Sequence, residues 1–288
     1  MRNLDENTIT DEAVRRLENC KDARFKEILT SLTRHLHAFA REVKLTEAEW
    51  MQGIEYLTAV GKMCDDKRQE FILLSDTLGL SMLVVALNNR YPPGCTEATV
   101  FGPFHTDAAS DFENGADISL GAKGEPAFVR GTVKGLDGKP IAGAVVDVWQ
   151  ADGDGVYDVQ YTDKDGALFA RGRLRANEKG EFWFKSIKPE FYSIPTDGPV
   201  GVWIDKAGRH PNRPAHLHFM VQAPGYQRLI THVFRSDDPY LDSDAVFGVR
   251  SSLIADWKRH DAGKAPDGSA VAVPYYTLDY DFVLNPAN

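Results

Sequence analysis

The sequence contains few cysteines and no surplus of basic residues. Cys20, Cys64 and Cys95 are odd in number, far apart and outside any CxxC motif, which favours free thiols over a disulfide framework. The 33 lysines and arginines against 42 aspartates and glutamates give a formal net charge of −9, whereas nucleic-acid binding needs a positively charged face. These absences predict a protein of a reducing compartment, the cytoplasm, that does not bind nucleic acid.

Long apolar runs are also absent. The longest run, at about 78–87, is shorter than the roughly 20 residues that a spanning helix needs, and residues 1–10 carry no apolar core of a signal peptide. What is present is an ordinary globular composition, with 43% hydrophobic and 26% charged residues in 288 residues. We therefore expect a globular protein that neither spans a membrane nor carries a visible secretion signal.

The first 90 residues show helical periodicity. Apolar residues recur at spacings of three and four over 25–39, which is typical of an amphipathic helix. Thr46 and Glu49 form a capping box that begins a second helix. Segment 71–87 is apolar on nearly all sides and is expected to be buried, either between other elements or against another subunit. These patterns predict an N-terminal all-α domain over residues 1–90.

After residue 90 the pattern changes to short β-branched and aromatic segments separated by turns. Because no helical pattern lies between them, they favour an antiparallel β-sandwich over alternating β–α units, so the fold is mixed and mainly β. The Asp137-Gly138 turn predicts a hairpin between the first two strands. Residues 91–126 form a long connector, and such loops are often functional. The sandwich is expected over residues 127–288, with strands at 128–134, 141–150, 168–175, 181–187, 216–222 and 229–234.

Two histidines give the sharpest local signal. His216 and His218 lie in one of the expected strands, where residues two apart point to the same face, so both imidazoles can reach one metal ion. His35 and His37 have the same spacing, but in a helix such residues lie on roughly opposite faces and cannot chelate together. The strand pair therefore indicates either a metal site or two histidines held by ordinary hydrogen bonds.

Two histidines alone do not define the metal. Zinc would need a third His, Cys or carboxylate ligand, and the candidates His105, His210 and His232 are scattered. The acidic segment 152–157 resembles a calcium loop, but Val156 occupies its third acidic position and breaks the EF-hand pattern. The pattern thus supports a β-sandwich with a two-histidine metal site, and it leaves a zinc hydrolase or a non-catalytic binding module open.

A wider set of motifs resembles the intradiol ring-cleaving dioxygenases. The set comprises Tyr157, Tyr192 within Tyr-Ser-Ile-Pro-Thr-Asp-Gly-Pro-Val-Gly, and the run Arg-Pro-Ala-His-Leu-His that ends at His218. The resemblance covers essentially the whole chain, including the N-terminal helices. It implies one non-haem Fe(III) per chain, held by Tyr157, Tyr192, His216 and His218. Two phenolates and a bound hydroxide would neutralise the trivalent charge, which explains a ferric rather than a ferrous ion.

Within the family, residues 100–105 resemble the hydroxyquinol branch, whose substrate is benzene-1,2,4-triol. The implied reaction of this triol with O2 in aromatic catabolism yields 3-hydroxy-cis,cis-muconate or maleylacetate, and a catechol or chlorocatechol 1,2-dioxygenase is the alternative. Two residues are implied to be catalytic: Arg213 stabilises charge that develops on the ring, and Tyr192 leaves the metal when substrate binds. The implied substrate pocket comprises Leu73, Asp76, Val100, Phe101, Gly102, Pro103, Phe104, Ile194, Pro195 and Arg213.

Two further histidines are expected near the site as supporting residues rather than ligands. They are His105 and His232, and His232 stands where catechol enzymes are expected to carry a glutamine. The resemblance also implies a homodimer through the N-terminal helices, often with a phospholipid in the helical interface. The expected partners are therefore a small aromatic diol or triol, O2, a second copy of the chain and a lipid.

Overall fold

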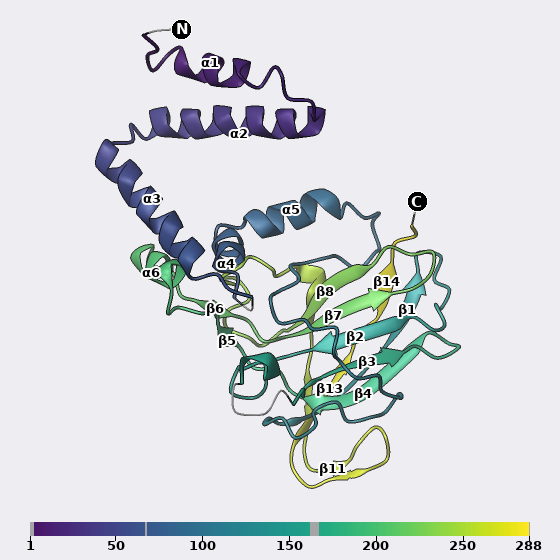
Figure 1. Ribbon diagram of the computed structural model, residues 1–288. Coiled ribbons are helices and arrows are strands. Elements are labelled where there is room, and N and C mark those ends of the chain that lie inside the picture. Colours follow the sequence, from purple (N-terminus) through teal and green to yellow (C-terminus); the bar gives the residue numbers. More distant parts are fainter. Residues whose placement is uncertain (1–2, 67, 162–166, 288) are drawn as a thin grey trace. The chain divides into compact units, whose positions relative to one another are not determined.

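The computed structural model describes residues 3–66, 68–161 and 167–287, and the chain divides into two compact units, residues 1–59 and 60–288 (Figure 1). The first unit holds α1 (Ile9–Arg15), α2 (Ala23–Glu42) and most of α3 (Glu47–Lys62). The predicted capping box forms, because the backbone N–H of Thr46 donates to Glu49 at 2.9 Å and the N–H of Glu49 donates to Thr46 at 3.2 Å. Both helices predicted in this region are confirmed.

The second unit begins with two short helices, α4 (Glu70–Thr77) and α5 (Leu80–Asn88). The apolar segment 71–87 folds into these two helices. Gly79 lies between them at φ 75°, a left-handed conformation that favours glycine and ends the helix. The prediction that this segment is buried within the chain is wrong, because the helices lie at the surface. Burial by another subunit stays a prediction. The exposed side chains, 47–59% accessible, are Phe71, Ile72, Leu78, Leu80, Leu83, Val84 and Leu87.

Among the described residues, we find no single helix with the length and apolar character needed to cross a membrane. The bent pair α4 and α5, with 79° between its halves, meets the length and composition test only when both halves are taken together.

The rest of the unit is built from two five-stranded sheets, with most neighbouring strands antiparallel. This confirms a mainly β sandwich that follows N-terminal helices along the chain. Three pairings are parallel: β1 with β13, β1 with β14, and β8 with β9. The first sheet contains β1 (Pro126–Gly135), β4 (Glu181–Ile187), β10 (Lys258–His260), β13 (Tyr275–Asp279) and β14 (Phe282–Leu284). The second contains β2 (Val145–Trp149), β3 (Arg171–Arg175), β7 (His216–Gln222), β8 (Leu229–Arg235) and β9 (Ile254–Ala255).

Shorter elements connect the sheets. Two strand pairs form separate ladders of two residues per strand. One helix follows Tyr192 along the chain. These elements are β5 (Tyr192–Ser193) with β6 (Asn212–Arg213), β11 (Gly263–Lys264) with β12 (Ala270–Val271), α6 (Pro199–Lys206), and the 3-10 turns Asp158–Gln160 and Ser251–Leu253.

The predicted hairpin forms only beside its turn, where Lys134 pairs with Pro140 in an antiparallel bridge, and the pairing does not continue between β1 and β2. The N–H of Gly138 donates to the carbonyl of Gly135 at 3.0 Å, but β1 pairs with β4 while β2 pairs with β3 and β7. The chain crosses to the other sheet because both strands bury apolar side chains in one shared core. Val129 of β1 and Val148 of β2 belong to the same buried cluster but to opposite sheets.

Strand β7 separates the core from the site. Leu217, Phe219 and Val221 are fully buried in the cluster between the sheets. His216 and His218 alternate with them and therefore point to the other face of the sheet. The connector passes over that face, since the ring of His218 lies next to Gly102. The histidines are therefore buried under a loop rather than in the sandwich core.

Candidate metal and active site

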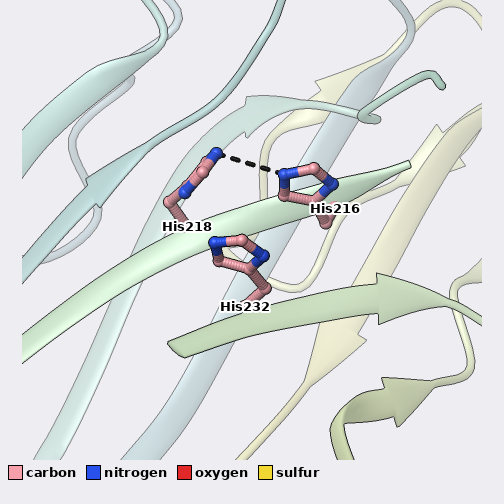
Figure 2. A group of neighbouring side chains, drawn as sticks. All are labelled: His216, His218 and His232. Carbon is pink, nitrogen blue, oxygen red and sulfur yellow. Dashed lines mark hydrogen bonds between the residues drawn. The ribbon is translucent and has the colours of Figure 1, made fainter. Parts of the chain in front are cut away.

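The structure brings His216 and His218 together on one face of β7. Their Nε2 atoms lie 3.1 Å apart and both side chains are buried (Figure 2). The Nδ1 atom of His216 is 2.6 Å from the carbonyl oxygen of Pro214. A carbonyl only accepts hydrogen bonds, so Nδ1 carries the proton and Nε2 keeps its lone pair.

Both imidazoles are uncharged at neutral pH. Burial, reinforced by the nearby Arg213 charge, lowers the pKa of His216 to about 3. Burial also lowers the pKa of His218 well below its ordinary value. The two Nε2 atoms therefore present neutral nitrogen donors to the same space, which is what a metal site requires.

Tyr157 and Tyr192 add two phenol oxygens beside the histidines. The Oη of Tyr157 is 2.7 Å from the Nε2 of His218, and its buried ring stacks on Phe104 at a centroid distance of 4.3 Å. The Tyr192 ring lies edge-on to Tyr157 at 5.4 Å. Burial, followed by the proximity of the second ionisable phenol, Tyr192, raises the pKa of Tyr157 well above its ordinary value. A phenolate here would therefore need a cation beside it.

His232 makes a third buried histidine, directly opposite His218 in the ladder of β7 and β8. One ligand atom from each of the three histidines lies within 4.8 Å of the others (Figure 2). The ring of His232, however, stacks on His216 with 4.5 Å between centroids and 15° between planes. An imidazole lone pair lies in the plane of its own ring. The two stacked rings occupy nearly parallel, offset planes, so their lone pairs do not point at one common position, and His216 and His232 are poorly arranged to hold the same ion.

Arg213 stands between these groups. Its Nη1 is 3.3 Å from the Oη of Tyr192 and 3.4 Å from the Nε2 of His216, while its Nε is 3.1 Å from the carboxylate of Asp244. The ladder of β5 and β6 places Tyr192 directly opposite Arg213. Burial opposes the guanidinium charge, but Asp244 and Tyr192 outweigh it and raise the pKa of Arg213. The site therefore holds a permanent positive charge beside the phenol oxygen.

The connector contributes the wall over the histidines. Gly102 has a φ of 77°, and a Cβ at this position would lie 3.0 Å from the Cε1 of His218. Only a glycine combines this conformation with so close an approach. Val100 is buried and Phe101 is 39% exposed. This stretch thus packs directly on a candidate ligand.

His105 and His210 do not join the cluster. The Nε2 of His105 lies 3.2 Å from the carboxylate of Asp147, and Nδ1 of His210 accepts a hydrogen bond from the backbone of Asn212 at 3.1 Å. Both rings are thus engaged by other groups. The ring of Trp149 separates His105 from the site, since it stacks on His218 at 4.7 Å and contacts His105 edge-on at 4.9 Å.

The remaining predicted pocket residues differ in burial. Asp76 is buried, and burial raises the pKa of its carboxyl despite the Ser81 hydroxyl and the Arg213 charge, which lower it. Ile194 is buried as well. The other three, whose contribution to a pocket stays a prediction, are Leu73 and Pro195, both half-buried, and Pro103, which is exposed.

Sequence reasoning missed two buried carboxylates. Asp244 pairs with Arg213, and Asp158, next to the candidate ligand Tyr157, forms a buried ion pair with Arg171. Arg171 also donates to the carbonyl of Phe104 at 3.1 Å. Each pair joins a strand residue to a residue outside that strand, since Arg213 lies in β6 and Arg171 in β3, and no spacing rule links such positions. The one available signal was the two buried arginines' need for an anionic partner.

The comparisons with known proteins agree with this geometry. A family model described as "Catechol dioxygenase N terminus" matches residues 22–96, and one described as "Dioxygenase" matches residues 100–286. The chain therefore belongs to the intradiol ring-cleaving dioxygenase family, and it is an enzyme. The predicted resemblance is confirmed.

Similar proteins narrow the branch of the family. The chain is 59% identical to a 6-chlorohydroxyquinol 1,2-dioxygenase of Cupriavidus pinatubonensis over 99% of both chains. It is 48% identical to a hydroxyquinol 1,2-dioxygenase of a Rhizobium species, with 95% of this chain and 93% of the relative covered. A solved hydroxyquinol 1,2-dioxygenase from Pseudomonas putida DLL-E4 is 50% identical with a TM-score of 0.91, covering 98% of this chain and 99% of that one.

A solved catechol 1,2-dioxygenase from an Acinetobacter species shares 26% identity and a TM-score of 0.84, covering 98% of this chain and 92% of that one. The fold is thus common to both branches, while the sequence is more similar to the hydroxyquinol relatives.

Proposed function

We propose that the protein is a hydroxyquinol 1,2-dioxygenase that cleaves benzene-1,2,4-triol with O2 to 3-hydroxy-cis,cis-muconate, or its tautomer maleylacetate, in aromatic catabolism in the cytoplasm. The observation that carries this proposal is the convergence of two neutral imidazoles and two phenols beside Arg213. The substrate is supported by the names of the relatives at 48–59% identity. The 59% relative makes 6-chlorohydroxyquinol the second substrate to test.

Tyr157, Tyr192, His216 and His218 would hold one Fe(III) ion per chain. The donors fit this ion, because phenolate oxygens suit a hard trivalent cation and the Nε2 lone pair of His216 faces the site. The Tyr157 phenol, whose pKa is raised by burial, would lose its proton only to such a cation. When bound, such an ion would supply a site for the neighbouring hydroxyls of the substrate and would make the ring reactive toward O2.

Two residues would act directly on the substrate. The Oη of Tyr192 would accept a proton from a substrate hydroxyl, so that Tyr192 serves as a base as well as a candidate ligand. Before that step, Arg213 stabilises the phenolate oxygen, since its Nη1 lies 3.3 Å away. The same guanidinium, which remains charged and planar, then stabilises the negative charge that develops on the ring.

Asp76 would select the triol over the diol. It is one of two buried carboxylates of α4, the other being Glu70, which pairs with Arg68, and the family resemblance puts that helix over the substrate ring. Its carboxylate would accept a hydrogen bond from the third hydroxyl of hydroxyquinol. With catechol the same group would stay buried without that partner, at a cost of about 1–3 kcal/mol.

Oxygen uptake with hydroxyquinol, 6-chlorohydroxyquinol and catechol, measured side by side on the purified protein, tests the proposal together with metal analysis. We expect a reddish protein with iron near one per chain and the highest kcat/KM on hydroxyquinol or its chloro derivative. The highest kcat/KM on catechol would move the chain to the catechol branch. A colourless, zinc-loaded protein that still cleaved substrate would refute the iron assignment.

A homodimer through the N-terminal helices, residues 1–90, completes the proposal. Its support is the apolar surface that the single chain exposes on these helices, since patches of this kind mark interfaces. On α2 the exposed side chains, 48–56% accessible, are Phe25, Ile28, Leu32, Leu36 and Phe39. A phospholipid bound in that interface would be detected by organic extraction and mass spectrometry of the purified protein.

A further inference from the structure

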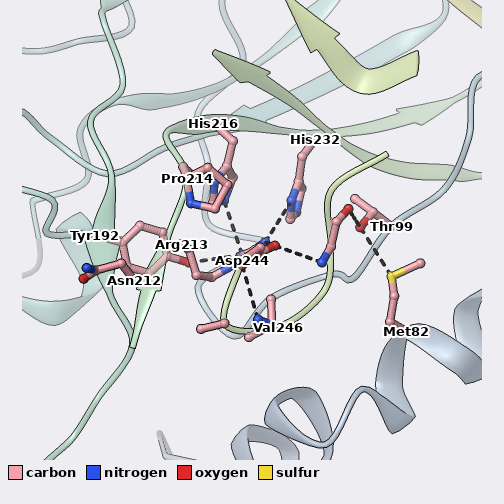
Figure 3. Close-up of polar contacts among 12 residues, drawn as sticks. Met82, Thr99, Tyr192, Asn212, Arg213, Pro214, His216, His232, Asp244 and Val246 are labelled. Carbon is pink, nitrogen blue, oxygen red and sulfur yellow. Dashed lines mark hydrogen bonds and ion pairs between the residues drawn. The ribbon is translucent and has the colours of Figure 1, made fainter. Parts of the chain in front are cut away.

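Arg213 uses two different edges of its guanidinium. One edge, Nε and Nη2, faces the two carboxylate oxygens of Asp244 at 3.1 and 3.3 Å (Figure 3). Nη1 is thereby left to face the Oη of Tyr192 and the Nε2 of His216. Because the guanidinium is planar and rigid, gripping one edge fixes the direction of the other.

The carboxylate of Asp244 is itself held in place. Its Oδ1 accepts the backbone N–H of Val246 at 3.2 Å, and its Oδ2 accepts the N–H of Gly248 at 2.8 Å. Each oxygen therefore receives one backbone donor and one guanidinium donor, and Asp244 is 5% exposed. A carboxylate in this environment cannot rotate without losing several hydrogen bonds at once.

The loop that carries Asp244 is attached on two sides. The N–H of Ala245 donates to the carbonyl of Asn212, next to Arg213, at 3.1 Å. On the other side the hydroxyl of Thr99, in the connector, donates to the carbonyl of Gly248 at 2.6 Å. Figure 3 shows these groups converging between β6 and the connector. The loop is thus fixed to the strand that carries Arg213.

Gly248 is required for space rather than for conformation. A Cβ added there would lie 2.9 Å from the Nη2 of Arg213 and 3.1 Å from the Oδ2 of Asp244, and its φ lies outside the left-handed range. An alanine would therefore press on the ion pair while leaving both charges in place.

We propose that Asp244 is the positioning residue of Arg213, and that loop 244–248 sets the direction in which the guanidinium meets the reacting substrate. This inference rests on the proposed function for the role of Arg213. Among the described residues the Asp244 carboxylate makes hydrogen bonds to Arg213 and to its own loop but none to the four candidate ligands, so Arg213 is the side chain through which it reaches the site. Asparagine cannot replace it, since four donors face the group and an amide offers an acceptor at only one of its two ends.

A double-mutant cycle tests the inference on the substrate that the wild-type enzyme turns over. We expect Asp244→Asn to lower kcat/KM about tenfold to a hundredfold, mostly through kcat, because a shift of about 1 Å in a catalytic group has effects of this size. In the Arg213→Gln background, Asp244→Asn should add no further loss. Effects that multiply in the double variant, or an unchanged kcat in Asp244→Asn, would overturn the proposal.

Gly248→Ala keeps the test decisive if the charge variants do not fold. It should lower kcat at least about fivefold while iron content stays at the wild-type level, because only the guanidinium direction changes. One control is Gly263→Ala, in an exposed strand where the nearest atom to the added Cβ is 3.8 Å away. The other is Asp281→Asn, an exposed carboxylate that also accepts a backbone N–H. Both control variants should retain wild-type kcat. A wild-type kcat in Gly248→Ala would refute the inference.

Failure of the proposed function would be recognised separately. If the wild-type protein turns over none of the three ring substrates, the crystal structure of the Gly248→Ala variant decides. A guanidinium whose Nη1 has moved away from the Oη of Tyr192 supports the positioning role of the loop, and an unmoved one overturns it.

Discussion

The sandwich and the N-terminal helices contain equally regular apolar patterns, yet only the sandwich covers its apolar face within one chain. Leu217 and Phe219 of β7 are fully buried, whereas Leu32 and Phe39 of α2 are 51% and 53% exposed. Periodicity shows which face of an element is apolar. It does not show what covers that face. The sandwich covers its own apolar face, and the partner of the α2 face stays a prediction.

Removing one candidate ligand should have the largest effect. His218→Ala deprives the site of a donor that has no replacement in position, so we expect loss of iron, colour and ring cleavage. His35→Ala is the matched control, because His35 has the same spacing to His37 but lies on the exposed surface of α2. Visible absorbance and metal analysis distinguish the two, and iron retained in His218→Ala would contradict the assignment.

A core substitution tests whether the sandwich is complete within one chain. Leu217→Ala removes a fully buried side chain and should lower the free energy of unfolding by about 2–5 kcal/mol. Leu136→Ala, at an exposed position of the turn after β1, should change it by less than about 0.5 kcal/mol. Urea denaturation measures both. Equal effects would mean that the sandwich core contributes no more stability than the surface.

Charges on α2 test whether its exposed face is an interface. Leu32→Asp together with Leu36→Asp should raise the dimer dissociation constant at least about 100-fold, or about 2.7 kcal/mol, with iron and activity retained. The control is Leu136→Asp, which makes the same apolar-to-charged substitution at an exposed position of the other unit and should leave the dimer intact. Sedimentation of the wild type as a monomer at micromolar concentration would refute the dimer itself.

The smallest expected effect concerns α4, a helix that belongs to the second unit. Asp76→Ala should shift the ratio of kcat/KM for hydroxyquinol to catechol about tenfold toward catechol, because the unpaired carboxylate is removed. Asp76→Asn should weaken hydroxyquinol turnover, and both variants should keep the iron and its colour. If Asp76→Ala does not change the ratio of kcat/KM for hydroxyquinol to catechol, the selectivity must come from Val100, Phe101 and Ile194.

Most individual elements were predictable from the sequence because their signals are local. The strands at 181–187 and 216–222 were predicted with the observed bounds, and the capping box at Thr46 formed as expected. The hairpin after Asp137-Gly138 formed only beside its turn, since the pairing of the next strand depends on which sheet buries it. Segment 71–87 failed because composition cannot distinguish a core helix from an apolar surface.

The candidate site also has one part that was predictable from the sequence and one part that was not. The sequence by itself determined that His216 and His218 share a face, because alternation along a strand follows from backbone geometry alone. Only the tertiary structure decided that His232 stacks on His216, that Gly102 presses on His218 and that Asp244 grips Arg213. These contacts join residues that are 16 to 116 positions apart, and their geometry depends on how the connector and the loops pack over the sheet.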